Sequence, residues 1–179
     1  AGCLPGDLKL VGVSIGPGGF TGLRIAAATA QMLAEATGCA LVAVPTALVC
    51  ARASGIEEGH VAVALASKRD TTWLTVVDAA TMTVEPGAGL VDAQSATAHL
   101  QRCSTLLADE HLPRPITEVA EGMELNVRAL SWCPKACLEL SEAGHVANAH
   151  ISSECLVPLY PRAPEAVALF EARRQVHKG

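Results

Sequence analysis

Two short apolar, β-branched runs near the start of the chain are typical of buried strands. Residues 9–15 (Lys-Leu-Val-Gly-Val-Ser-Ile) and Ala40–Val44 are apolar almost throughout, a pattern that indicates strands covered on both faces. Between them lie a glycine-rich turn at residues 16–19 and a long apolar stretch that ends at Gly38. The order strand, turn, helix, strand predicts a βαβ unit with a right-handed crossover.

The helix predicted after the glycine turn has few polar side chains. Thr21 is a candidate cap for its first turn, and Gly38 is a suitable stop. Between residues 23 and 36 the polar side chains are Arg24, Thr29, Gln31 and Glu35, and alanines run round the rest of the helix. A helix that covers one face of a sheet normally has a polar outer stripe. We therefore expect the outer side to be covered as well, either by a second polypeptide or by a further N-terminal part of its own lobe.

The pattern changes near residues 55–59, which we interpret as a lobe boundary. The stretch at 103–118 has no clear period. The other predicted elements are a helix at 46–54, a strand at 61–66, hairpin strands at 71–77 and 82–85, a helix at 92–102 begun by Asp92, a helix at 134–143 ended by Gly144, an extended segment at 156–160 and a terminal helix at 164–174.

Composition restricts the classes of function. The 179 residues are 50% apolar and 17% charged, which favours a folded core over disorder. Only five aromatic residues are present and the formal net charge is −5, so a base-stacking or polyanion-binding surface is not expected. No apolar run is long enough to span a bilayer. Seven scattered cysteines are typical of reduced thiols in the cytoplasm.

The glycine turn is a candidate phosphate site. A strand that leads through glycines into a helix directs backbone N–H groups and the positive end of the helix dipole towards one point. The candidate residues are Gly16, Gly18, Gly19 and Thr21. The alternative is a tight turn that uses glycine for positive φ, with Phe20 as an apolar plug. The turn lacks the lysine of a P-loop and the third glycine of a dinucleotide fingerprint.

Two segments resemble the TsaB (YeaZ-like) family of bacterial tRNA threonylcarbamoyladenosine biosynthesis. Residues 16–34 resemble the signature G-x-G-S-F-T-G-L-R-I-G-x-x-x-A-K-G-L-A, and residues 158–166 resemble P-x-Y-x-R-x-P-x-A. This chain departs from the family pattern at Gly19 (usually Ser), Ala26 (usually Gly) and residues 31–32 (usually Lys-Gly). Family members begin with a strand that carries an Asp-Thr-Ser turn, and this sequence starts beyond it, so no nucleotide role of that turn is transferred here.

The resemblance implies an α/β fold of the actin-like type (ASKHA, the sugar kinase and heat-shock type) with two lobes built on mixed sheets. Residues 1–55 are then the remainder of the N-terminal lobe, with residues 158–179 packing back on it. Residues 56–157 are a second, smaller α/β lobe. The first lobe is expected to be incomplete.

The same resemblance implies a non-catalytic scaffold that pairs with TsaD and, with TsaE, modifies the adenosine beside the tRNA anticodon. It implies no cofactor, no tRNA binding by this chain alone and no membrane contact, and it leaves a homodimer possible. The interface is expected on the alanine-rich helix and the residue before it. The residues are Phe20, Leu23, Arg24, Ala27, Ala30, Gln31 and Ala34.

The sequence contains no pattern that clearly indicates catalysis. The six histidines include no pair four residues apart, which a metal-ligating H-x-x-x-H helix requires. Cys133, Cys137, His145 and His150 are too closely spaced for the usual zinc finger. No G-x-S-x-G elbow is present. We therefore predict no catalytic residue and no metal ligand. The alternatives are an active metallopeptidase-like or ATP-using transferase of the same superfold, and a homodimeric interaction module.

Overall fold

The computed structural model describes residues 2 and 4–162. Its strands are β1 (Leu10–Ser14), β2 (Ala40–Val44), β3 (His60–Lys68), β4 (Thr71–Asp78), β5 (Thr83–Val84), β6 (Gly89–Val91), β7 (Cys103–Ala108) and β8 (Asn126–Ala129). Its α-helices are α1 (Phe20–Thr37), α2 (Thr46–Ala53), α3 (Ala93–Leu100), α4 (Arg114–Gly122) and α5 (Pro134–Val146). Short 3₁₀ turns, η1 and η2, cover Pro5–Asp7 and Ser153–Cys155.

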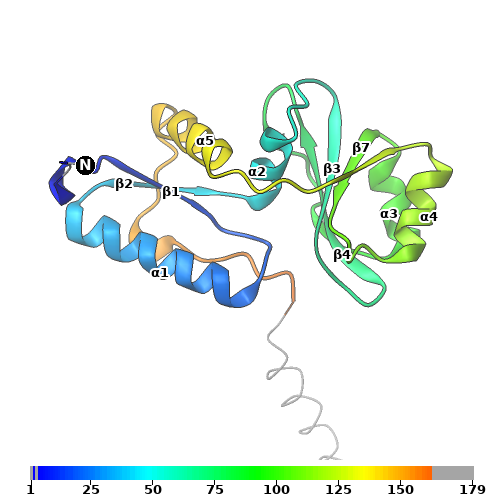
Figure 1. Cartoon of the computed structure of the whole chain (residues 1–179), viewed down its shortest axis with the longest axis horizontal. Helices are drawn as coiled ribbons and strands as arrows, with labels where there is room; N and C mark the ends of the chain where they lie inside the picture. Colours follow the sequence, from blue (N-terminus) through cyan, green and yellow to red (C-terminus); the bar gives the residue numbers. More distant parts are fainter. Residues whose placement is uncertain (1, 3, 163–179) are drawn as a thin grey trace, which may run out of the picture.

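The first sheet consists of two parallel strands with a helix on each side (Figure 1). β1 pairs with β2 from Leu10↔Ala40 to Ser14↔Val44, as the predicted βαβ unit requires. Alternate residues of β1 contact opposite layers: Val11 and Val13 pack in the cluster with α1, and Leu10 packs in the cluster with α5. Burial on both faces explains why these strands are almost continuously apolar.

The second sheet is mixed and has six strands. Its path is β5-β4-β3-β7-β8, with β6 also paired to β4. β4 runs antiparallel to β3, whereas β7 runs parallel to β3 and β8 parallel to β7. Helices α3 and α4 lie on one face, where Ala96, Leu100 and Ile116 complete a buried cluster with the strands (Figure 1).

Helix α2 covers the other face of the second sheet and links the two sheets. Its Ala47, Cys50 and Ala51 pack with Val61 and Val63 of β3. Its Val49 belongs instead to the cluster of buried residues around β2 and α5. A single short helix is therefore part of two cores.

Several local predictions need correction. Helix α1 is preceded by Gly19 as N-cap, and no side chain caps it, so Thr21 does not have the predicted role. Gly144 does not end α5; it lies within the helix, where a Cβ would come within 2.9 Å of Val42 Cγ1. The unassigned stretch 103–118 contains β7 and the start of α4.

The division into two lobes stays a prediction, and the packing of α5 bears on it. Within the range 56–157, α5 leaves the second sheet and packs on the first, where its Ala136 is buried beside Val42 and Val44. The helix predicted at 164–174 lies outside the described residues. No helix in the described part of the chain combines the length and apolarity needed to cross a membrane.

Candidate functional site

The glycine turn is held tightly by its own chain. Gly16 has φ of +107°, its N–H donates to Thr46 Oγ1 at 3.0 Å, and its carbonyl accepts from the Thr46 N–H at 2.9 Å. Ser14 Oγ also lies 2.7 Å from Thr46 Oγ1. A Cβ on Gly16 would lie 2.7 Å from the carbonyl oxygen of Leu159, so both the φ angle and the space require glycine here.

These contacts change the prediction of a phosphate site. The Gly16 N–H is bonded to Thr46 and does not face a ligand. Gly19 and Thr21 are exposed at the start of α1, and Gly18 is half-buried beside Leu23. The four predicted residues therefore do not offer one common set of backbone donors. Phosphate binding by Gly16, Gly18, Gly19 and Thr21 stays a prediction.

Helix α1 has an inner and an outer face, both apolar. Leu23, Ala27 and Ala30 are buried, and the last two pack against Val13 and Leu41 of the first sheet. Ala34 is half-buried in the same cluster, and Gln31 Nε2 donates to the carbonyls of Ser153 and Leu156. Of the seven residues predicted to contact a partner, these five are therefore used within the chain. Phe20 and Arg24 are exposed.

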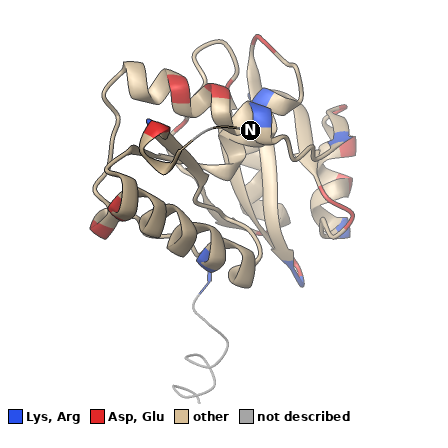
Figure 2. Ribbon diagram, turned by 60° about the vertical axis from the view of Figure 1, so that its left-hand side comes forward, with Lys and Arg blue, Asp and Glu red and all other residues tan. Residues whose placement is uncertain are grey.

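The outer face of α1 is the open one. The sequence predicted that this side is covered, but the seven interface residues named from it do not include Ile25 or Met32. Ile25 is 62% exposed and Met32, two turns later, is 71% exposed. Ala28 and Ala36 are also exposed. Their helical spacing places Ala28 between Ile25 and Met32 and Ala36 one turn after Met32 on the same face. Figure 2 shows that this helix carries charge only towards its ends. We call Ile25, Ala28, Met32 and Ala36 the outer stripe of α1.

An aromatic contact joins the start of α1 to the C-terminal segment. The Phe20 and Tyr160 ring centroids lie 5.0 Å apart at an interplanar angle of 41°. The guanidinium carbon of Arg24 lies 5.0 Å from the Phe20 centroid, a cation–π arrangement. The contact of Arg24 within the chain is therefore with this ring, and its place in a partner interface stays a prediction.

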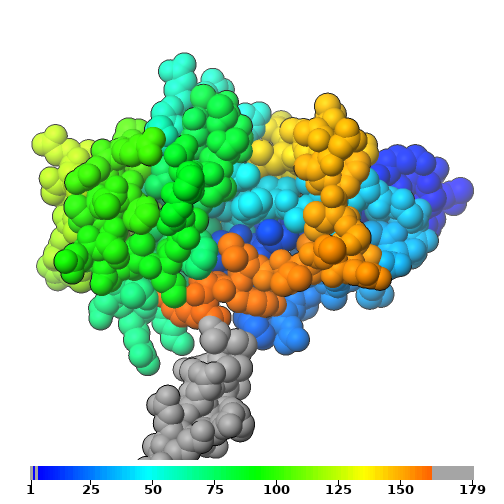
Figure 3. Space-filling model, turned by 180° about the vertical axis from the view of Figure 1, so that it is seen from behind, coloured from blue at the N-terminus to red at the C-terminus, as the bar shows by residue number. Residues whose placement is uncertain are grey.

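The C-terminal segment continues from α1 to the second sheet, as the orange surface in Figure 3 shows. The Leu159 N–H donates to the carbonyl of Ile15 at 2.7 Å. Arg162 then reaches the β3–β4 hairpin, where it donates to the Ala66 carbonyl and to the carbonyl and hydroxyl of Thr71, the last two at 3.1 and 2.6 Å. This segment ties both sheets together.

The described residues contain one group of three side chains suited to a metal ion, and the sequence did not predict it. His60, Asp78 and Glu85 bring ligand atoms within 4.8 Å of one another. The cysteines and histidines considered for zinc do not form such a group: His145 and His150 contact each other, with 2.7 Å between Nδ1 and Nε2. Burial raises the pKa of Cys50 to about 12 and that of Cys103 to about 11, so neither is an activated nucleophile.

A shallow hollow lies where β7 and β8 end. Leu112, Val127 and Trp132 supply apolar lining, while Asp109 and Arg128 supply charge. The carboxyl ends of parallel strands are where open α/β sheets most often bind ligands.

Comparison with known proteins decides the family. The profile of the family described as "TsaD: tRNA N6-adenosine threonylcarbamoyltransferase" matches residues 1–128. The chain belongs to the TsaD family. No curated protein sequence gives a match.

Solved structures agree with this family assignment at the level of the fold. YeaZ from Pseudomonas aeruginosa superposes with a TM-score of 0.67 at 18% identity, covering 89% of this chain and 77% of that one. A second structure from the same organism, described as an uncharacterized protein with similarity to peptidase YEAZ, gives a TM-score of 0.64 at 19% identity and covers 90% and 77%. The expected actin-like α/β fold and the resemblance to YeaZ in fold are confirmed.

Proposed function

We propose that this chain is a non-catalytic, cytoplasmic partner subunit of a TsaD-type transferase in the threonylcarbamoyl modification of tRNA adenosine, with TsaE completing the assembly. The observation that carries the proposal is the outer stripe of α1. Ile25 and Met32 project to the outside of a helix whose inner face is packed on the first sheet. Apolar side chains at this spacing form a continuous strip. Such a strip is typical of a surface that another helix covers.

The charge of the chain supports a partner role over direct tRNA binding. The formal net charge is −5, and binding a polyanion requires a cluster of Lys and Arg side chains. Figure 2 shows the blue residues scattered over the described part of the chain. We therefore propose that tRNA is bound by the partner and that this subunit acts by holding the partner.

The proposal predicts which substitutions separate the partner from this chain. We expect Ile25→Glu or Met32→Glu to weaken binding to the TsaD protein of the same organism at least tenfold, because each buries an unpaired carboxylate in the interface. Val146→Glu is the matched control, since Val146 is 82% exposed at the end of α5, away from α1. Calorimetric titration measures the affinities, and circular dichroism checks the fold.

Two results would reject this function. The first is undiminished binding by both α1 variants. The second is a stable dimer of this chain, seen by light scattering, that excludes the TsaD protein and dissociates in the Met32→Glu variant. That second result would instead assign α1 to the homodimeric alternative.

A transferase activity of this chain is the second candidate, because the matching family profile is described by that activity. The metal of such an enzyme would require the helical histidine pair, and the six histidines of this chain include no pair at that spacing. The residues present therefore do not fit that metal site. Threonylcarbamoyl transfer to tRNA by this chain without any partner would establish the enzymatic function and reject the scaffold.

A further inference from the structure

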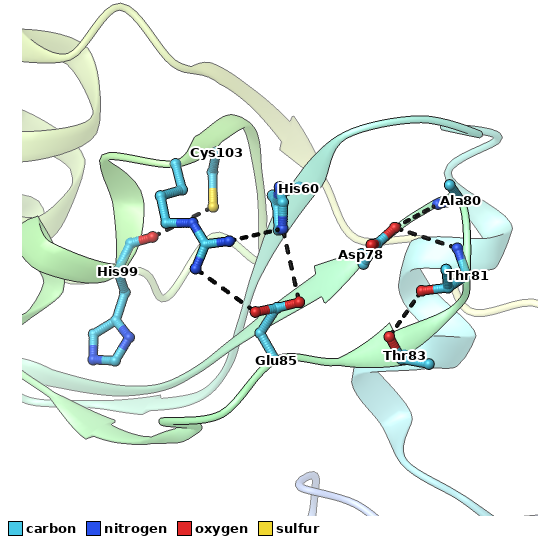
Figure 4. Close-up of polar contacts among 9 residues, drawn as sticks. His60, Asp78, Ala80, Thr81, Thr83, Glu85, His99 and Cys103 are labelled. Carbon is cyan, nitrogen blue, oxygen red and sulfur yellow. Dashed lines mark hydrogen bonds and ion pairs between the residues drawn. The ribbon is translucent and has the colours of Figure 1, made fainter.

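Three side chains from separate places in the sequence meet at one edge of the second sheet (Figure 4). His60 opens β3 and is the register partner of Asp78, the last residue of β4. Glu85 follows β5, and its N–H donates to the Val76 carbonyl at 2.8 Å, which places it beside the other two. His60 Nε2 lies 3.8 Å from Glu85 Oε1.

The imidazole of His60 presents a lone pair to this cluster. Arg102 Nη2 lies 3.3 Å from His60 Nε2. Because a guanidinium only donates hydrogen bonds, Nε2 must accept this one, and the ring proton is then on Nδ1. A neutral imidazole binds metal ions through such a lone pair, which becomes available here once Arg102 moves away.

The two carboxylates are also arranged to accept a cation. Asp78 Oδ1 accepts the N–H groups of Ala80 and Thr81 at 2.9 and 3.2 Å, which fixes the carboxylate and leaves Oδ2 out of both bonds. Glu85 Oε2 lies 3.7 Å from Arg102 Nη1.

Arg102 is the cation of the cluster, and it is the group that can leave. Its side chain is 65% exposed, whereas those of His60 and Glu85 are 26% exposed. When Arg102 moves away, the two carboxylates carry two negative charges, which a divalent ion would balance. A long, solvent-facing arginine gains little from an exposed ion pair and moves away at low cost.

We propose that His60, Asp78 and Glu85 form a divalent metal site, with Arg102 as the counter-cation when no metal is bound. One imidazole nitrogen and two carboxylate oxygens suit Mn²⁺ and its borderline neighbours better than Ca²⁺ or Mg²⁺, which prefer oxygen alone. Ligand atoms in such sites lie about 3–3.5 Å apart, so atoms now within 4.8 Å need small side-chain rotations. Water would complete the coordination. The ion would fasten β3, β4 and the segment after β5.

The test uses Mn²⁺, because zinc would also bind the free thiols of this chain. The reduced, chelator-treated full chain is titrated with MnCl₂ while electron paramagnetic resonance counts unbound ions. We expect one ion per chain, with affinity falling at least tenfold in His60→Ala and in Glu85→Gln. Arg102→Gln should bind several-fold more tightly, because the competing cation is gone.

The remaining histidine pair supplies the control. His145 and His150 contact each other away from the proposed site. A double variant, His145→Ala/His150→Ala, removes both imidazoles and should bind Mn²⁺ as the parent does. Circular dichroism checks each variant, and Glu85→Gln, which keeps the size of the side chain, remains informative if His60→Ala misfolds. Three outcomes would each show an ion-pair cluster and overturn the proposal. They are no stoichiometric Mn²⁺ binding, binding by His60→Ala and Glu85→Gln equal to that of the parent, and weaker binding by Arg102→Gln than by the parent.

Discussion

The packing of α5 on the first sheet depends on a glycine in β1. A Cβ built on Gly12 would lie 2.5 Å from the Cβ of Ser141 and closer still to its Oγ. Ser141 is fully buried and its hydroxyl donates to the Cys137 carbonyl at 2.7 Å. Because carbon atoms pack at about 3.5–4.0 Å, Gly12→Ala would require α5 to move away from β1 by about 1 Å.

That movement would also loosen the packing of α5 at a second point, so the cost should be at the upper end of the range for overpacking. One turn further along α5, Gly144 is so close to Val42 that a Cβ there would come within 2.9 Å. We expect Gly12→Ala to lower the free energy of unfolding by about 3 kcal/mol. With a urea m-value of about 2 kcal/mol/M, the midpoint of unfolding would fall by about 1.5 M.

Two second-site variants separate steric overlap from other causes. Ser141→Gly removes the Cβ that collides with the new methyl group, and it should recover about 2 kcal/mol in the Gly12→Ala background, although alone it costs about 1 kcal/mol as a helical glycine. Ser141→Ala keeps the Cβ and should recover much less. A Gly12→Ala variant within 0.5 kcal/mol of the parent, or equal rescue by both changes, would refute the reasoning.

Three further outcomes follow from the contacts described. Arg162→Lys should destabilise the chain by about 1–2 kcal/mol in urea unfolding, because an ammonium cannot serve three acceptors as the guanidinium fork does. Asp92 caps α3, and the hydrogen bonds that its carboxylate accepts from the Ser95 hydroxyl and N–H lower its pKa. This stability is present above the unfolded pKa and lost as pH falls through the folded one, so Asp92→Ala should flatten the acid limb of a stability-against-pH curve. In the native chain, mass spectrometry should find iodoacetamide on exposed Cys155 and none on buried Cys50.

The sequence was most informative where structure is local. The apolar runs and the glycines at 16–19 and 38 predicted β1, α1 and β2 closely, because both periodicity and turn chemistry are properties of neighbouring residues. It was least informative about the orientation of α1. Alanines lie on every side of that helix, so the pattern could not distinguish the inner face with Ala27 and Ala30 from the outer face with Ile25 and Met32.

The cluster of His60, Asp78 and Glu85 was invisible for a different reason. Its members are 18 and 7 residues apart and come together only through the register of β3, β4 and β5. A search for spaced histidines cannot find a site with one histidine. The only available signal was the predicted hairpin, whose pairing would have placed Glu85 near the end of β4 had the register been worked out residue by residue.

The return of α5 to the first sheet means that cutting the chain near residue 55 would not yield two self-sufficient halves. The N-terminal piece would keep β1 and β2 but expose to water the layer that Ala136 now shields. The C-terminal piece would lose α2, and with it the cover over Val61 and Val63. Heat or denaturant should therefore melt both sheets in a single step.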